Sequence, residues 1–153
     1  MRSLESARDA LDLVLLSASD PPEHQTVVLL GKPGQGGGVS VIIEGEVPPS
    51  ELASTLGLLA GAAGAGSPIV VATITPDPPT FTDDELASWH DLDAAVAEHG
   101  AVLCEWFLVG GGTAVAVGEW SGVEPRWPPP LNGSPASGSR RRRASTRAFR
   151  PRR

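Results

Sequence analysis

The sequence predicts an α/β domain in which helices cover a mixed β-sheet in three layers. Its segments alternate between helical and strand periodicity in the order α-β-β-α-β-α-β-β, which favours one sheet with helices packed against it. Residues 68–75, "PIVVATIT", are apolar nearly throughout, as is typical of a central strand covered on both faces. The chain has 153 residues, and its apolar fraction of 41% is enough for one core.

The first predicted elements are a helix and a β-hairpin. Residues 4–18 place leucine, valine and alanine at helical spacing, and the two prolines of "SDPPEH" end this helix. Residues 26–31, "TVVLLG", and 39–45, "VSVIIEG", are rich in β-branched residues and predict the two strands of the hairpin. The glycine-rich segment 32–38 predicts a long connecting loop between them.

The remainder of the domain is predicted to contain two helices and three strands. Ser50 is the expected N-cap of a helix over 51–63, whose leucines share one face. Thr82 is the expected N-cap of a second helix, because three acids follow it and complement the positive end of the helix dipole. The three strands are predicted at 68–75, 101–110 and 113–119.

The net charge of −6 conceals a division of charge along the chain. Residues 1–133 contain all 18 acids but only four basic residues, a formal charge of −14, whereas residues 134–153 contain eight arginines and no acid, a charge of +8. We therefore predict a folded domain over 1–122 and a disordered Pro-, Ser- and Arg-rich tail over 123–153. The tail can attract nucleic-acid phosphates or an acidic protein through its arginines. These are Arg140, Arg141, Arg142, Arg143, Arg147, Arg150, Arg152 and Arg153.

The composition narrows the class of protein. One cysteine excludes an intrachain disulfide and a cysteine-rich zinc site. No apolar run approaches the length of about 20 residues that spans a bilayer, and acids interrupt the N-terminal segment where a signal peptide needs apolar residues. We expect a cytoplasmic protein without a membrane partner.

The familiar site motifs are incomplete in this sequence. "GKPGQGGGV" lacks the Ser or Thr and the helix that a phosphate-binding loop requires, so it predicts a hairpin loop. His90 and His99 lie nine residues apart on one predicted helix and point to opposite faces, and His24 lies in a surface loop. Cys104 alternates with Trp106 on one face of a strand, which predicts a buried structural thiol.

Glu44, Glu46 and Glu85 are the candidate carboxylate cluster. Glu44 and Glu46 are two residues apart, so an extended strand would place both side chains on one side of the sheet. Exposed carboxylates without a shared role are the commoner outcome for such residues.

Five segments occur in an order that matches a known family: "EHQTVVLLG", "VSVIIEGEV", "SELASTLGLLAGAAG", "SPIVVATITPDPPTFTDDEL" and "LDAAVAEHGAVLCEWFLVGGGTAVAVGE". Together, residues 23–119 resemble the RadC-like branch of the JAB/MPN metalloprotein family. The loop "TPDPPTFTDDE" occupies the place of that family's motif H-N-H-P-S-G-D-P-x-P-S-x-x-D. The resemblance implies a JAB/MPN domain over 1–122, with its cytidine-deaminase-like fold, and an association with DNA repair.

The resemblance also implies a metal site, but at altered positions. The family's two zinc-binding histidines fall at Thr73 and Thr75, its serine at Thr82 and its ligand aspartate at Glu85. Its general-base glutamate corresponds to Glu46 or, as a second choice, to the glutamate two residues earlier. Zinc binds imidazole, thiolate or carboxylate, and neutral threonine hydroxyls do not replace two imidazoles.

These differences predict the function. Without a metal ion, the pKa of water stays far above the value of about 7 that zinc-bound water has, so a nearby glutamate cannot produce hydroxide at neutral pH. We expect a non-catalytic scaffold or interaction module without a cofactor or metal. One alternative is a metal-dependent hydrolase of the same family with an altered site that uses zinc, Glu46, Glu85 and an unplaced histidine. A second alternative is a nucleic-acid-binding accessory protein that acts through its arginine-rich tail.

Overall fold

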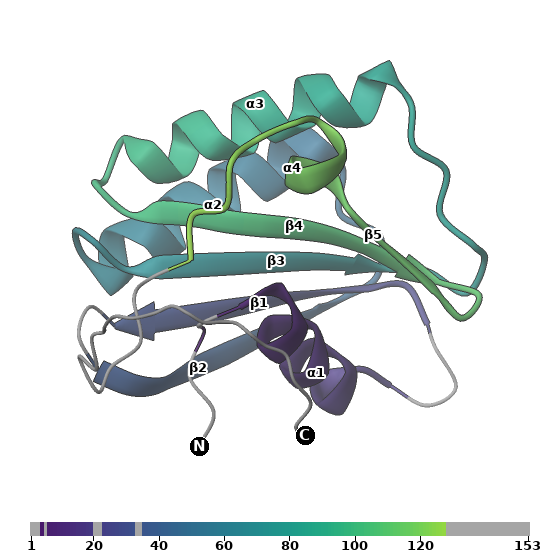
Figure 1. Ribbon diagram of the computed structural model, residues 1–153, viewed down its shortest axis with the longest axis horizontal. Helices are drawn as coiled ribbons and strands as arrows, with labels where there is room; N and C mark the ends of the chain where they lie inside the picture. The colour runs from purple at the N-terminus through teal and green to yellow at the C-terminus, as the bar shows by residue number, and fades with distance from the viewer. Residues whose placement is uncertain (1–3, 5, 20–22, 33–34, 128–153) are drawn as a thin grey trace, which may run out of the picture.

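In the computed structural model, an open five-stranded mixed sheet carries helices on both faces (Figure 1). The structure describes residues 4, 6–19, 23–32 and 35–127. The helices are α1 (Ala7–Ser17), α2 (Pro49–Ala63), α3 (Asp83–Ala97) and α4 (Val117–Trp120). The strands are β1 (Gln25–Lys32), β2 (Gln35–Glu44), β3 (Pro68–Ile74), β4 (Val102–Gly110) and β5 (Thr113–Ala116). The predicted mixed sheet with flanking helices is thereby confirmed.

The strand order β2-β1-β3-β4-β5 determines where the loops meet. β1 is antiparallel to both β2 and β3, and β3 is parallel to β4. Helix α3 forms the crossover between the two parallel strands. The start of β1 and the ends of β2, β3 and β4 therefore lie at one end of the sheet, and α2 and α3 both begin there (Figure 1).

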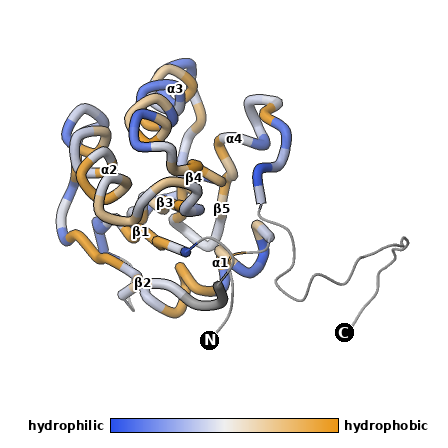
Figure 2. The backbone as a smooth tube through the Cα atoms, turned by 90° about the vertical axis from the view of Figure 1, so that its left-hand side faces the viewer, coloured by the Kyte–Doolittle hydropathy of each residue, from blue (hydrophilic) through white to orange (hydrophobic). Residues whose placement is uncertain are grey.

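Two apolar clusters, one on each face of the sheet, form the core. α2 and α3 pack on one face around Trp89, and α1 covers the other face around Val14 (Figure 2). Neighbouring residues of β3 alternate between these clusters, so Val70 packs toward α1 and Val71 toward α2 and α3. This two-sided burial explains why the strand lacks polar alternation. No helix in the described part of the chain is long and apolar enough to cross a membrane.

Three predicted boundaries are wrong. β2 begins at Gln35 rather than at 39, so the hairpin connection is short, and Gly38 pairs with Gly31 inside it. A Cβ on Gly38 would overlap the carbonyl oxygen of Leu30, so glycine here serves close strand pairing. Helix α2 starts after an N-cap at Pro48, which leaves Ser50 inside its first turn. The last strand stops at Ala116, and the short helix α4 replaces its predicted end.

A β-bulge in β4 overturns the predicted arrangement of Cys104 and Trp106 on one face. Ile69 pairs with Leu103 and Val70 pairs with Glu105, so Cys104 is the additional residue. Cys104 consequently packs toward α1, whereas Trp106 packs toward α2 and α3. The alternation in the sequence cannot indicate a bulge, because the extra residue is defined only by pairing with β3.

Residues 123–127, which the sequence places in the tail, contact the folded domain. Arg126 forms an ion pair with Asp93 of α3, with Nη1 2.6 Å from Oδ1, and its guanidinium lies 5.7 Å from the centroid of the Trp89 ring. Trp127 packs with the cluster that faces α1. The rest of the predicted tail, 128–153, lies outside the described residues.

Candidate functional site

A cavity of about 420 Å³ opens where β3 ends and the proline-rich loop 75–82 begins. Thr73 and Thr75 line it from the end of β3, and Glu85 lines it from the first turn of α3. Trp106 of β4 and His24, which precedes β1, also contribute to its walls. Three of the five positions that the family resemblance singled out therefore lie together around one cavity.

The hydroxyl groups of both threonines are engaged within the protein. Thr73 Oγ1 accepts a hydrogen bond of 3.0 Å from the indole Nε1 of Trp106, which is 4% exposed. Thr75 Oγ1 donates to the carbonyl oxygen of Asp77 at 2.8 Å, and the Thr75 backbone N–H donates to Val109 at 2.9 Å. These bonds shape the loop and satisfy an indole N–H that is otherwise costly to bury.

Thr82 and Glu85 form the N-terminal cap of α3. Thr82 Oγ1 accepts a hydrogen bond from the backbone N–H of Asp84, as the sequence predicts for an N-cap. Glu85 Oε1 in turn accepts bonds from the Thr82 backbone N–H at 2.7 Å and from the Thr82 hydroxyl at 3.0 Å. This capping box gives both residues a structural role at the rim of the cavity.

His24, which lines the cavity, also contacts Glu46, the second carboxylate among the five positions. The His24 Nδ1 lies 3.7 Å from Glu46 Oε2, although 79% of the Glu46 side chain is exposed. The sequence places His24 in a surface loop and gives no sign of this pairing. The contact arises because the backbone N–H of Gly45 donates to the carbonyl oxygen of His24, which joins the end of β2 to the start of β1.

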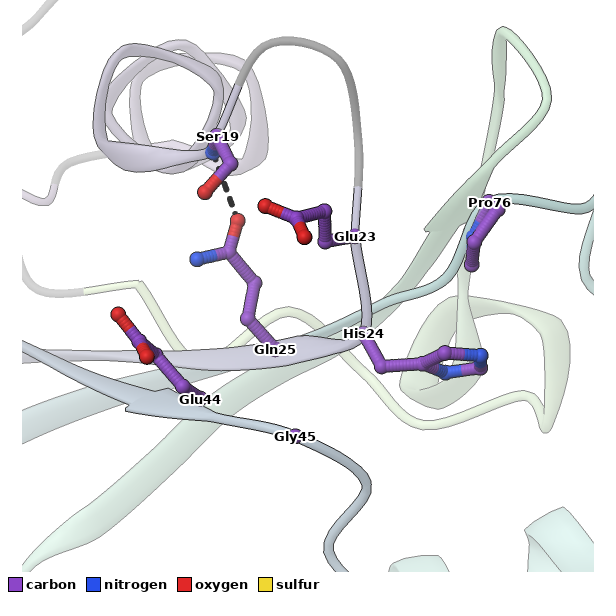
Figure 3. Close-up of a pocket in the computed structure, with 7 residues that line it drawn as sticks. All are labelled: Ser19, Glu23, His24, Gln25, Glu44, Gly45 and Pro76. Atoms are coloured by element: carbon purple, nitrogen blue, oxygen red, sulfur yellow. Dashed lines mark hydrogen bonds between the residues drawn. The ribbon is translucent and has the colours of Figure 1, made fainter.

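Glu44 lines a second cavity, of about 460 Å³ (Figure 3), and His24 lines both cavities. Figure 3 shows the side chains of Glu23, Gln25 and Glu44 on one side of the backbone and the His24 ring on the other. The Gln25 side-chain oxygen accepts a 2.7 Å bond from the Ser19 backbone N–H. Gly45, with a φ of 90°, ends the extended strand before Glu46, and both Glu44 and Glu46 are exposed.

The donor set around the first cavity does not fit zinc. Among the described residues, no group of three His, Cys, Asp or Glu side chains lies close enough together to hold a metal ion. At the two histidine positions of the family motif, hydroxyl groups are already hydrogen-bonded to Trp106 and Asp77. A catalytic zinc site needs three protein ligands and an open position.

The remaining candidate side chains lie elsewhere. His90 is exposed on α3, and the His99 ring lies against Gly61 of α2. Burial raises the pKa of the Cys104 thiol to about 11, so the reactive thiolate is disfavoured at neutral pH. The eight tail arginines, Arg140–Arg143 and those that follow, lie outside the described residues.

Glu105 is a buried acid that the sequence reasoning missed. Its side chain is 5% exposed, and Oε1 accepts bonds from the backbone N–H groups of Trp106 at 2.9 Å and Gly118 at 2.6 Å. Oε2 accepts a third bond, from Glu119 at 3.1 Å. The carboxylate thus holds α4 against β4 through these hydrogen bonds. Burial raises the pKa of Glu105 above its ordinary value of 4.5, and the backbone N–H groups oppose this rise in part.

We expect Glu105 to make the free energy of unfolding decrease with pH in the acid range. Because the folded-state pKa is raised, the folded chain binds more protons than the unfolded chain between the two pKa values. The stabilising contribution is complete below the unfolded-state pKa and declines as the pH rises through the folded-state pKa. Urea unfolding of wild type and Glu105→Gln at several pH values measures the difference. A difference that stays constant or grows in favour of wild type with pH would contradict this expectation, and Glu98→Gln, at an exposed site, is the control.

Comparison of the chain with protein-family models, with curated proteins and with solved structures finds no match.

Proposed function

We propose that this chain is a metal-free, non-catalytic interaction module of the JAB/MPN type, whose binding surface is the cavity beside loop 75–82. The observation that carries the proposal is the hydrogen bond between Trp106 Nε1 and Thr73 Oγ1. It uses the side chain at one expected histidine position to satisfy an indole, and it places an aromatic wall on the cavity. Cavities lined by apolar groups with a few polar ones are suited to binding.

The two alternatives have weaker support. A metal-dependent hydrolase could draw on His24, Glu46 and Glu85, but Glu85 Oε1 is held in the capping box and Glu46 is largely exposed. A nucleic-acid accessory role would depend on the arginine-rich segment 140–153, whose charge supports phosphate binding in general. The proposed module, cytoplasmic by expectation, can include that segment as a second contact.

We expect the full-length protein to retain no stoichiometric zinc after dialysis and to show no rise in Tm when zinc is added. The physical reason is that, among the residues that the structure describes, no three suitable donors converge on the cavity. Metal analysis and thermal unfolding with added zinc provide the measurement. A site filled at about 100 times its Kd would add about 2.7 kcal/mol to the free energy of unfolding, so occupancy is easy to detect.

A matched variant makes this test informative about the resemblance. Thr73→His combined with Thr75→His restores two imidazoles near Glu85, and we expect a zinc-dependent rise in Tm from the double variant. Each single variant serves as a control, because one added imidazole leaves the ligand set incomplete. Zinc retained by wild type, and lost in His24→Ala or Glu85→Ala, would favour the hydrolase instead. A double variant that folds but shows no rise in Tm with zinc would argue against the JAB/MPN assignment.

A further inference from the structure

The basic side chains of the described residues lie away from one end of the sheet. At the end of the sheet where β1 begins and β3 ends, carboxylates gather and no described lysine or arginine is present. The described basic residues, Arg8, Lys32 and Arg126, lie toward the opposite end: at the start of α1, at the end of β1 and beside the start of β4. The carboxylates are those of Glu23, Glu44, Glu46, Glu51, Asp77, Asp83, Asp84 and Glu85.

The two cavities at this end are neighbours, because His24 borders both, and together they make up the groove. Glu23 and Glu44 line one half of the groove, and Asp77 lines the other half beside the aromatic wall of Trp106. Within the described part of the chain, these three carboxylates form no ion pair. The groove thus combines unpaired anionic groups with the accessible aromatic ring of His24, whose side chain is 45% exposed, a combination that suits arginine.

We infer that the groove is a docking site for the arginine run Arg140–Arg143 of the same chain. The body and the tail carry complementary charges of −14 and +8 over 1–133 and 134–153. A guanidinium forms paired hydrogen bonds with a carboxylate and stacks on aromatic faces, so arginine satisfies both parts of the groove. The ligand class of the proposed interaction module is then a cationic, arginine-rich peptide. This inference rests on the proposed function, in which no metal occupies the groove.

The length of the chain permits this docking. The described chain ends at Trp127, close to the start of β4 and therefore at the end of the sheet away from the groove. The path along β3, a strand of seven residues, is about 23 Å at about 3.3 Å per residue. Residues 128–139 can extend to about 40 Å at no more than 3.6 Å per residue, so the arginine run reaches the groove. A tether of this kind gives an effective concentration in the millimolar range.

Docking of the tail in the groove would oppose nucleic-acid binding by the tail. Arginines held by the groove carboxylates are not free to bind phosphates. The acidic domain would then compete with nucleic acid for the arginines of the tail. Phosphate binding would require release of the tail from the groove.

The test is paramagnetic broadening of backbone amide signals in the full-length, nuclease-treated protein with a nitroxide at Ala144→Cys. Cys104 does not compete for the reagent, since it is buried and its thiol pKa is raised to about 11. We expect selective broadening of the amides of His24, Gly45 and Asp77. Raising the salt from about 0.1 M to about 1 M shortens the Debye length from about 10 Å to about 3 Å and should abolish the broadening.

A charge-matched pair of variants makes the result specific. The triple variant Glu23→Gln, Glu44→Gln, Asp77→Asn removes three groove charges, and we expect loss of the broadening. The control Asp91→Asn, Glu98→Gln, Glu124→Gln removes three exposed charges outside the groove and should leave it unchanged. Equal loss in both triple variants, or broadening centred on another surface, would overturn the inference.

Two further outcomes would contradict docking of the arginine run in the groove. No groove broadening at low salt would show that the tail does not dock. Broadening that appears only between a nitroxide-labelled copy and a separate isotope-labelled copy would assign the groove to a second chain. Metal analysis measures zinc retention independently of the amide broadening, so a failure of the metal-free proposal is distinguishable from a failure of docking.

Discussion

Trp89→Ala is expected to lower the free energy of unfolding by about 3–5 kcal/mol. Trp89 is 1% exposed and has the largest fully buried side chain among the described residues, and it belongs to the cluster between the sheet and helices α2 and α3. Its loss leaves a cavity that the surrounding strands cannot fill, and it removes the ring beneath the Arg126 guanidinium. Urea unfolding monitored by circular dichroism measures the change.

Trp120→Ala is the matched control for this substitution. The Trp120 side chain is 67% exposed, and its main contact is a tilted stack with Phe81 at a centroid distance of 4.4 Å. Loss of such a pair costs about 0.5–1.5 kcal/mol. Equal effects at the two positions would show that Trp89 does not occupy a rigid core site.

Gly110→Ala is expected to destabilise the protein by about 1–3 kcal/mol and to displace the loop that borders the groove. A Cβ at Gly110 would overlap the carbonyl oxygen of Asp77 and would lie 2.7 Å from that of Thr75. The backbone hydrogen bond from Thr75 to Val109 would then lengthen or break. Faster hydrogen exchange at the Thr75 amide, together with urea unfolding, tests both parts of the expectation.

Gly57→Ala provides the contrasting case. Gly57 lies inside α2, and a Cβ there would approach no atom closer than 3.9 Å. Alanine has the higher helix propensity, so we expect stabilisation by up to about 1 kcal/mol. If Gly110→Ala leaves stability and exchange unchanged, the loop is not held against the end of β4 as described.

Local signals in the sequence located the site region but not its construction. The apolar run of β3, the prolines and the cap at Thr82 each act over a few residues, so the strand, the loop and the start of α3 were predictable. The family resemblance then added Thr73, Thr75 and Glu85, and the structure places these around one cavity. The fold-family assignment itself stays a prediction.

The contacts that determine the chemistry of the site come from residues distant in the sequence. Trp106 lies 33 residues from Thr73, and Glu105 lies 13 residues from Gly118, so no spacing rule indicates either hydrogen bond. His24 reaches the cavity because pairing of β1 with β3 brings it to the strand end. The bulge at Cys104 likewise exists only in the pairing with β3.

The sequence by itself determined the order of elements, the capped start of α3, the apolar centre of the sheet and the division between an acidic body and a basic tail. These follow from periodicity, capping and charge, which act locally or depend on composition alone. Only the tertiary structure decided that Thr73 satisfies the indole of Trp106, that Glu105 anchors α4, and that four carboxylates line the groove. Such features depend on strand order and register, which bring together residues that the sequence keeps apart.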